Sequence, residues 1–269
     1  MSDASIDVDV IVLDVDGGAM LRDCLASIGA QTLPPRRVIV FDNGSRTPTA
    51  GAIRSEINLG FAGGMNAALQ HSNAPFVALI NNDVLLDADW LATVADAIAR
   101  DDKLAAVQTI IRRDGETVDG AGIDVSDGTI RQIGHGLPLT ATLSPAWGVS
   151  ATAALYRRAA IGPRPFNERF FAYYEDVEIC ARLREGGWAL TVLHVAKAVH
   201  RGSQSASLLG SRALFLRTRN RYWVARLHPG TARIGALLRE DIFLLLRGRS
   251  SLSGIVAGML GAAITVSKP

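Results

Sequence analysis

The chain has 269 residues, of which 48% are hydrophobic and 20% are charged. This length is enough for one large α/β domain, or for one domain with a tail, and for a sizeable buried core. The composition excludes a disordered or collagen-like chain.

The net charge of +2 is unevenly distributed along the chain. Residues 201–249 hold ten arginines against two acids, so this segment carries +8 and the remainder about −6. A strongly basic segment indicates an anionic partner, such as a membrane surface or a phosphate-bearing substrate.

The two cysteines and the first residues bear on the cellular compartment. Cys24 and Cys180 lack metal-type spacing and suit structural roles in a reducing compartment. Residues 1–8 are polar and acidic, without the basic start and apolar run of a secretory signal. We therefore expect a cytosolic location.

The first 45 residues follow a strand–helix–strand pattern. An apolar run at 8–14 predicts a buried strand, apolar residues at helical spacing over 21–28 predict a helix, and 38–41 predict a second buried strand. Both strands end in small polar residues, which is the βαβ pattern of a parallel sheet. Ligands of such sheets bind beyond the carboxyl ends of the strands.

Polar side chains follow directly after these two strands. Asp14, Asp16 and Gly17 come after the first, and Asp42 and Asn43 come after the second. We expect the carboxylates to project at the ligand-binding edge. An ordinary turn is the alternative for residues 42–45, since each residue in it suits one.

A glycine-rich segment covers residues 58–66. Gly60, Gly63 and Gly64 precede Ala67, which predicts a loop entering a helix, whose backbone N–H groups could hold an anion. Close packing is the alternative use of the glycines. The spacing is not the dinucleotide-binding fingerprint.

A third apolar strand is predicted over 76–80, and it ends in Asn81, Asn82 and Asp83. A carboxylate at the end of a central strand suits a hard cation that also binds a diphosphate, because magnesium takes only one or two protein carboxylates. A strand-end turn is the alternative. The spacing over 90–98 predicts the next helix.

The middle of the chain is less regular. We predict a strand over 104–111, a long excursion with short strands over 112–140, a strand over 147–156 and a helix over 157–162.

Three carboxylates stand directly behind four aromatic residues in the stretch 170–178. Helical spacing begins at Asp176 and stops at Gly186, so Glu175 and Asp176 lie at a helix N-terminus. The helix dipole alone would favour acids there. The functional alternative is a general base at the rim of an aromatic-walled pocket.

The last third begins with a predicted strand over 188–195, followed by His200. A lone histidine is more often a structural residue than a ligand. Amphipathic helices rich in arginine follow. The uncharged stretch 250–267 is marginal for a membrane span, and an interfacial or docking helix suits it at least as well.

Taken together, these motifs resemble the inverting family 2 glycosyltransferases, in particular their bacterial rhamnosyltransferase-like branch. The resemblance runs in order from about residue 8 to residue 226, with fitting gaps. The motifs that carry it are Asp14–Gly18, Asp42–Ser45, Asn58–Asn66, Asn81–Asp83, Phe170–Glu178 and His200.

The resemblance implies a GT-A fold: α/β, with a Rossmann-like, mostly parallel central sheet, helices on both faces and C-terminal helices. It implies a GT-A domain over 1–226, with a nucleotide-binding part at about 1–110 and an acceptor-binding part at about 111–226. A helical tail that could associate with a membrane would occupy 227–269.

The resemblance also implies roles for individual residues. Asp176, with Glu175 beside it, matches the acidic pair that contains the catalytic base, and Asp83 with His200 matches a site for a divalent cation, Mg²⁺ or Mn²⁺. The donor nucleotide would be contacted by a larger set: Asp14, Asp16, Gly17, Asp42, Asn43, Asn58, Gly60, Gly63, Gly64, Asn66 and Asn82.

The implied reaction moves a sugar from a nucleotide-diphosphate sugar, dTDP-rhamnose or a UDP-sugar, to a hydroxyl of a glycan or lipid-linked acceptor in cell-surface polysaccharide synthesis. We expect no nucleic-acid partner, and peripheral contact with anionic lipid at the inner face of the plasma membrane.

Two other functions stay open. Asp14-Val15-Asp16 stands where these enzymes usually carry an asparagine–aromatic–asparagine segment, which leaves room for a non-catalytic relative that binds a sugar nucleotide or a partner. A nucleotidyltransferase would need a basic glycine-rich loop, whereas residues 14–18 contain neither lysine nor arginine.

Overall fold

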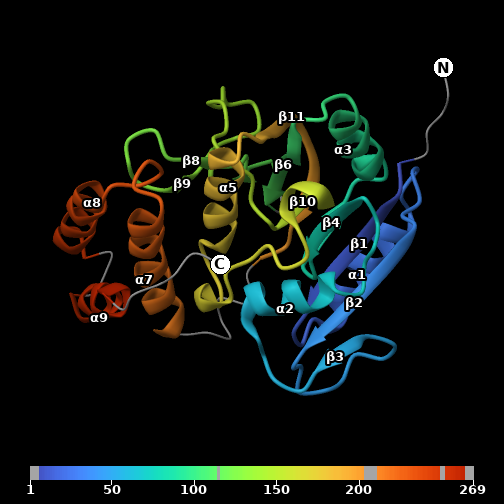
Figure 1. Cartoon of the computed structure of the whole chain (residues 1–269), viewed down its shortest axis with the longest axis horizontal. Helices are drawn as coiled ribbons and strands as arrows, with labels where there is room; N and C mark the ends of the chain where they lie inside the picture. The colour runs from blue at the N-terminus through green and yellow to red at the C-terminus, as the bar shows by residue number, and fades with distance from the viewer. Residues whose placement is uncertain (1–5, 114–115, 203–210, 249–251, 264–269) are drawn as a thin grey trace.

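The computed structural model describes residues 6–113, 116–202, 211–248 and 252–263. One nine-stranded sheet runs through this part of the chain, in the order β3-β2-β1-β4-β10-β6-β11-β5, with β7 paired to β6 (Figure 1). The strands are β1 (Val8–Asp14), β2 (Arg37–Asn43), β3 (Ile53–Ser55), β4 (Phe76–Asn81), β5 (Val84–Leu86), β6 (Leu104–Arg113), β7 (Val118–Gly120), β10 (Ala153–Arg157) and β11 (Ala189–His200).

A separate two-stranded ribbon and the helices complete the fold. The ribbon consists of β8 (Ile123–Asp124) and β9 (Arg131–Gln132). The helices are α1 (Gly18–Gly29), α2 (Gly60–Leu69), α3 (Trp90–Ala99), α4 (Arg158–Ile161), the 3₁₀-helix η1 (Glu168–Phe170), α5 (Glu175–Glu185), α7 (Ser211–Leu227), α8 (Ile234–Leu246) and α9 (Leu252–Ala263).

The N-terminal half of the sheet is parallel, as predicted from its apolar runs. Strand β1 lies between β2 and β4 and pairs with both in parallel, with Val10 opposite Val38 on one side and Ala78 on the other. The carboxyl ends of the three strands therefore meet at one edge. This edge is where ligands of open α/β sheets bind.

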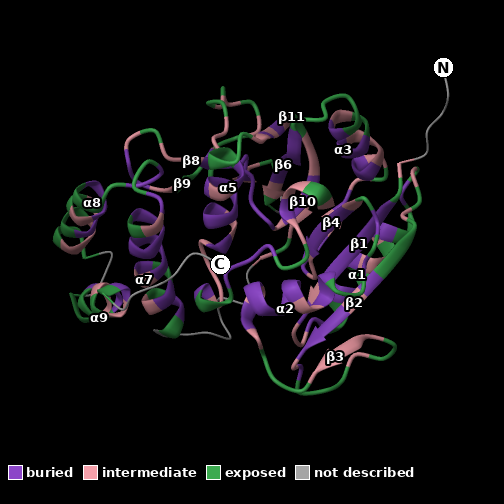
Figure 2. Cartoon of the chain, in the orientation of Figure 1, coloured by how far each residue is buried: buried purple, intermediate pink, exposed green. Residues whose placement is uncertain are grey.

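Alternate residues of these strands face two cores, because successive side chains of a strand point to opposite faces. Val10 and Val12 pack with α1 and α3, whereas Ile11 packs with α2 and with residues of α5 and α7. The sheet is thus covered by helices on both faces, and its central strands β1, β4, β10 and β6 are largely buried (Figure 2).

The other half of the sheet contains both parallel and antiparallel strand pairs. Two of its strand boundaries differ from the prediction, and one of its strands was not predicted. The strand predicted over 147–156 begins only at Ala153, and before it Ser150 N donates to the side-chain Oε1 of Gln108 in β6 (2.6 Å) rather than to a backbone carbonyl of that strand. The strand predicted over 188–195 continues to His200. Strand β5, which was not predicted, pairs with the end of β11.

The predicted helix start after the glycine-rich segment is also wrong. Helix α2 begins at Gly60 rather than at Ala67, so the glycines lie within its first turns. Gly64 faces Leu13 and Asn43, where a Cβ atom would lie within 3.0 Å of both side chains. Close approach to β1 and β2 is therefore what this glycine provides.

Helices α7, α8 and α9 form the C-terminal part of the fold (Figure 1). Gly258 of α9 packs closely against Thr218 of α7, and Tyr222 of α7 donates to Asp241 of α8 (2.7 Å). Within the described residues, no helix is long and apolar enough to cross a membrane. The domain boundary predicted at 226 falls near the end of α7 and stays a prediction.

Candidate functional site

The stretch between η1 and α5 has an unusual backbone. Phe171, Tyr173 and Tyr174 have φ angles of 64°, 71° and 68°, in the left-handed region that side chains with a Cβ rarely adopt. Asp16 is the other such non-glycine residue in the described part of the chain. Residues held in this way persist only where the surrounding structure fixes them, and they cluster at functional sites.

Asn220 of α7 is the residue that holds this stretch. Its side-chain amide donates to the carbonyl oxygens of Phe170 (2.9 Å), Ala172 (2.8 Å) and Tyr173 (2.7 Å). Asn220 is fully buried, so these bonds are shielded from water. The backbone that leads into the acidic helix start is therefore fixed by a side chain about 50 residues further along the chain.

Glu175 and Asp176 open α5 directly behind this stretch. Burial, and then the negative charge of Asp176, raise the pKa of Glu175 well above its usual value, and Glu175 Oε2 has no hydrogen-bond partner in the described part of the chain. Burial also raises the pKa of Asp176, although the N–H groups of Val177 and Ala151 oppose the rise. A carboxylate with a raised pKa is a stronger base than an ordinary one.

A cavity of about 720 Å³ lies in front of these acids. Its walls come from segments far apart in the sequence: the end of β4, the start of β10, the ribbon β8–β9, the aromatic stretch, α7 and β11. All four residues predicted as catalytic or metal-binding line it: Asp83, Glu175, Asp176 and His200. The fold therefore brings together acids that are more than 90 positions apart.

Asp83 and His200 are in direct contact at this cavity. His200 Nε2 lies 3.2 Å from Asp83 Oδ2, and its Nδ1 lies 2.7 Å from Asp119 Oδ2. Burial disfavours the imidazolium, but the two carboxylates outweigh burial and raise the pKa of His200 to about 9. The other carboxylate oxygen, Asp83 Oδ1, is buried and has no hydrogen-bond partner among the residues that the structure describes.

This arrangement fits a divalent cation with few protein ligands. Within the described residues no group of three acidic, histidine or cysteine side chains could hold a metal ion by itself. A cation at Asp83 Oδ1 would need further oxygens from a diphosphate and water, which is how Mg²⁺ is commonly bound at nucleotide sites.

The acids at the edge formed by β1 and β2 are used differently. Asp14 Oδ1 accepts from Asn82 Nδ2 (2.7 Å) and Gly17 N (3.1 Å), and its Oδ2 accepts from Thr49 Oγ1 (2.7 Å). Asp16 pairs with Arg46 at 3.0 Å. These contacts tie the loops after β1, β2 and β4 to one another.

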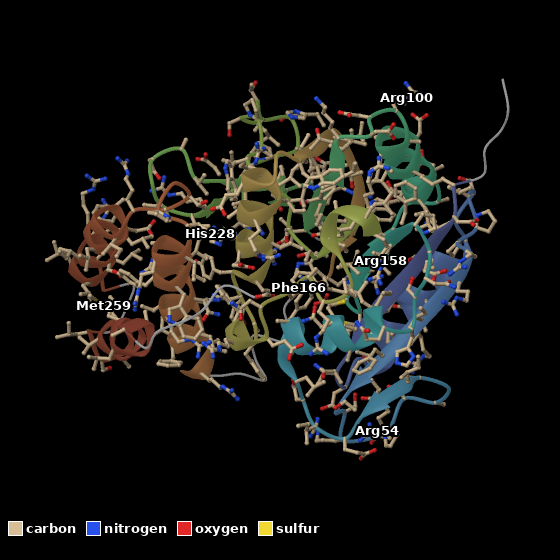
Figure 3. The ribbon with its side chains drawn as sticks, viewed as in Figure 1. Arg54, Arg100, Arg158, Phe166, His228 and Met259 are labelled. Carbon is tan, nitrogen blue, oxygen red and sulfur yellow. The ribbon has the colours of Figure 1, made fainter. Side chains whose placement is uncertain are left out.

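Asp42 forms a second closed network. It accepts from the backbone N–H groups of Ser45 (2.8 Å) and Thr49 (3.0 Å) and pairs with Arg54 of β3, which is labelled in Figure 3. Burial opposes its charge, but these donors prevail and lower the pKa of Asp42.

Asn43 fixes the loop that leads into α2. Its side chain accepts from Leu59 N (3.0 Å) and donates to Gly60 O (3.0 Å) and to Asn58 Oδ1 (3.3 Å). N–H groups in the first turn of α2 also have acceptors already, because Gly60 N donates to Asn58 Oδ1 (2.8 Å) and Ala62 N donates to Phe171 O (3.1 Å). Two of the N–H groups considered for anion binding are thus already satisfied.

Asn66 points to another part of the fold. Its side chain bonds to the backbone N–H and C=O of Phe166 and to Glu168 Oε1, which joins α2 to the segment before α5. Gly63 lies on the same helix, where a Cβ atom would lie 3.0 Å from the Cβ of Leu59. Both positions therefore serve packing of α2 and its neighbours.

The residues predicted to bind the donor and the residues of the cavity are separate sets. None of the eleven predicted donor contacts is among the described residues that line the cavity, although their neighbours Phe61 and Asn81 are. Their roles as donor contacts stay predictions.

Three cavity or support residues were missed by the sequence. Asp119 lies in the irregular excursion, where no spacing marks it. Arg217 is one of many arginines in a basic helix. Asn220 had a signal, because asparagine is unfavourable in a helix interior unless its side chain makes a specific bond.

Comparison with known proteins decides the family. The model of glycosyl transferase family 2 matches residues 10–162, which is more than half of the chain. The chain belongs to glycosyl transferase family 2. The predicted resemblance is thereby confirmed, and so is glycosyl transfer as the activity of the chain.

Curated relatives include the N-acetylglucosaminyl-diphospho-decaprenol L-rhamnosyltransferase of two Mycobacterium tuberculosis strains, CDC 1551 / Oshkosh and ATCC 25618 / H37Rv. Each is 26% identical over 302 aligned positions, which cover 90% of this chain and 93% of the relative. The match therefore extends beyond the family region into the C-terminal helices.

Solved structures with this fold include GalNAc-T7 with UDP, GalNAc and Mn²⁺ (13% identity, TM-score 0.63) and Staphylococcus aureus TarS 1–349 with UDP (18% identity, TM-score 0.55). They cover 84% and 79% of this chain, which spans 48% and 64% of theirs. At these identities the likeness shows the fold alone, and it confirms the predicted GT-A fold.

Proposed function

We propose that this glycosyltransferase moves a sugar, with inversion, from a nucleotide-diphosphate sugar to a hydroxyl of a glycan or glycolipid in cell-surface polysaccharide synthesis. The observation that carries the proposal is the cavity that gathers Asp176, Glu175, Asp83 and His200 from three distant segments. The relatives named as rhamnosyltransferases favour dTDP-rhamnose as donor, with a UDP-sugar as the alternative, and favour an acceptor sugar linked to a lipid through a diphosphate.

In the proposed reaction Asp176 takes the proton of the acceptor hydroxyl. The oxygen then bonds to the anomeric carbon from the face opposite the leaving group. The bond from that carbon to the donor phosphate oxygen breaks, and its electron pair leaves with the nucleoside diphosphate. Burial raises the pKa of Asp176 and so makes it a stronger base, and Glu175 is buried beside it with a raised pKa of its own.

Asp83 and His200 would hold a divalent cation, Mg²⁺ or Mn²⁺, with Asp83 Oδ1, which has no hydrogen-bond partner among the described residues, available for it. When bound, the cation neutralises charge on the leaving diphosphate. Asp83 is the principal protein ligand in this proposal, because His200 Nε2 lies 3.2 Å from Asp83 Oδ2 and could bind the cation only after losing its proton.

A thermal-shift experiment tests the donor and metal parts together. The protein is mixed with UDP, dTDP or GDP, each in the presence of Mn²⁺, Mg²⁺ or a chelator. We expect one of the three nucleotides to raise the unfolding temperature, and only when a metal is present. Asp83→Ala should remove the metal-dependent part of the shift, and Asp176→Asn should keep it. No shift with any nucleotide would favour the non-catalytic alternative.

We also propose that α8 and α9 place the enzyme against an anionic membrane. Seven of the twelve exposed large hydrophobic residues in the described part of the chain lie on these two helices, including Leu246 (82% exposed) and Leu260 (67%). Their outer faces are visibly exposed in Figure 2. Arg239 and Arg247 lie on α8 or directly after it, which adds positive charge to this apolar surface.

Flotation with vesicles tests this contact. Wild-type protein should float with phosphatidylglycerol vesicles at low salt, and the double variant Leu246→Ser/Leu260→Ser should not. Leu137→Ser is the matched control, since Leu137 is exposed (46%) but lies on the excursion far from these helices in sequence. Equal flotation of all three proteins would refute the contact.

A further inference from the structure

The positive side chains around the cavity differ in how they are compensated. Five basic or histidine side chains line it, and four of them contact a carboxylate within the described structure. These four contacts are Arg113 with Asp119 (3.1 Å), Arg131 with Asp127 (2.5 Å), His135 with Asp119 (3.9 Å), and His200 with Asp83 (3.2 Å). Arg217 is the fifth, and it has no carboxylate partner among the described residues.

Arg217 is held by an aromatic ring instead of by an acid. Its guanidinium carbon lies 4.5 Å from the centre of the Tyr173 ring, in the stretch that leads into Glu175 and Asp176. Arg212, on the same helix, lies 4.3 Å from the ring of Phe171. A ring contact positions a guanidinium but uses none of its N–H donors in an ion pair.

A third arginine, Arg219, lies near the other two on the same helix. Burial, together with the nearby charge of Arg212, lowers the pKa of Arg219 to about 10. Arg219 is already bonded to the carbonyl oxygens of Arg169 (2.9 Å) and Phe170 (3.1 Å). It therefore supports the aromatic stretch, whereas the other two arginines remain available to an anion.

We propose that Arg217, assisted by Arg212, binds the phosphate or diphosphate group of the acceptor and so presents the acceptor hydroxyl to Asp176. This inference rests on the proposed transfer reaction. Arg217 lines the same cavity as Asp176 and contacts the ring of Tyr173, three positions before that base in the sequence. A planar guanidinium matches the oxygens of a phosphate by two parallel hydrogen bonds.

The binding arm of the test needs no catalysis. Titration of geranyl diphosphate into the full chain, with a chelator present so that a metal at Asp83 does not contribute, gives the affinity by calorimetry. Arg217→Gln should weaken binding about tenfold or more, and Arg217→Lys should recover part of it. Arg100→Gln changes an exposed arginine at the end of α3 that does not line the cavity, and this variant should bind as the wild type does.

The kinetic arm compares two acceptors that differ only in charge. With a sugar linked to a lipid through a diphosphate, Arg217→Gln should raise the acceptor KM about tenfold and leave the donor KM unchanged. With the same sugar as a neutral alkyl glycoside, the variant should match the wild type. Hydrolysis of the donor without acceptor should also be unchanged, which shows that the variant is folded.

Three results would overturn the inference. These are unchanged diphosphate binding by Arg217→Gln, a raised donor KM, or an equal loss with both acceptors. Loss of binding to phosphatidylglycerol vesicles with intact geranyl diphosphate binding would assign Arg217 to lipid headgroups instead. If the wild type neither hydrolyses nor transfers any donor sugar, the proposed function fails, but the titration still decides whether Arg217 binds a diphosphate.

Discussion

The edge formed by β1 and β2 and the wall of the cavity are both rich in polar side chains, but they use them in opposite ways. At the edge, Asp14 and Asp42 have donors on both carboxylate oxygens, and Asn43 uses both ends of its amide. At the cavity wall, Asp83 Oδ1 and Glu175 Oε2 are buried, and neither has a hydrogen-bond partner within the described ranges of the chain.

We propose that this difference separates the side chains that fix loops from the side chains that take part in the reaction. A buried polar atom without a partner costs free energy, about 1–3 kcal/mol, so its persistence calls for an explanation such as a ligand or a catalytic role. The satisfied acids of the edge fix loops, whereas the unsatisfied acids of the wall are available to substrate and cation. Four predictions test this division, in order of expected effect.

Asp176→Asn should lower kcat about 10³-fold, because asparagine cannot take the proton of the acceptor hydroxyl. Donor binding, measured by the thermal shift, should stay near the wild-type value. Asp96→Asn is the control, since Asp96 is an exposed helix residue paired only with Arg100 in the described structure, and it should leave kcat unchanged. A variant within tenfold of wild type would show that Asp176 is not the base.

Gly60→Ala should destabilise the protein by about 3 kcal/mol, because this position joins the two regions. A Cβ atom there would lie 2.3 Å from Phe171 O, and the φ angle is +73°. Gly51→Ala is a matched control, with a φ of +74° and no atom within 4 Å of its Cβ.

Chemical denaturation measures both glycine variants. Gly51→Ala should lose only the backbone term, about 1 kcal/mol. If both variants lost the same amount, the contact between α2 and the aromatic stretch would contribute nothing to stability.

Asn220→Ala should lower the free energy of unfolding by about 2–3 kcal/mol, because three backbone carbonyls lose their donor. It should also lower kcat, since Asn220 fixes the backbone before Glu175. Asn73→Ala, which removes an exposed amide bonded to Arg36, is the control and should change neither quantity appreciably. A stability loss with full activity would limit Asn220 to a structural role.

Asp42→Asn should cost about 1–2 kcal/mol of stability at pH 7, because the carboxylate accepts from the backbone N–H groups of Thr49 and Ser45 and pairs with Arg54. The pKa of Asp42 is lower in the folded state than in the unfolded state. Its stabilisation is therefore present above the unfolded pKa of about 3.9 and is lost as the pH falls through the folded pKa.

Urea unfolding from pH 7 to pH 2.5 measures this effect. The stability difference between wild type and Asp42→Asn should shrink towards the acid end. A constant difference across that range would mean that the charge of Asp42 does not stabilise the edge.

Local sequence patterns account for most of the framework. Apolar runs and helical spacing predicted β1, β2, β4, α3 and the start of α5 at the acids, because burial of one face imposes a local periodicity that any stretch of sequence displays. The order of motifs also predicted the family, and with it Asp83, Glu175, Asp176 and His200 as one site.

Tertiary packing determines which polar groups are already bonded. Asp14 accepts from Thr49, Asp42 pairs with Arg54, and His200 contacts Asp119. Asn220 donates to backbone carbonyls of the aromatic stretch. These partners lie 12 to 81 positions apart, and their meeting depends on how helices and strands pack. The spacing of residues along the chain does not predict such contacts. The sequence therefore could not identify Arg217 as the arginine of its segment that lines the cavity.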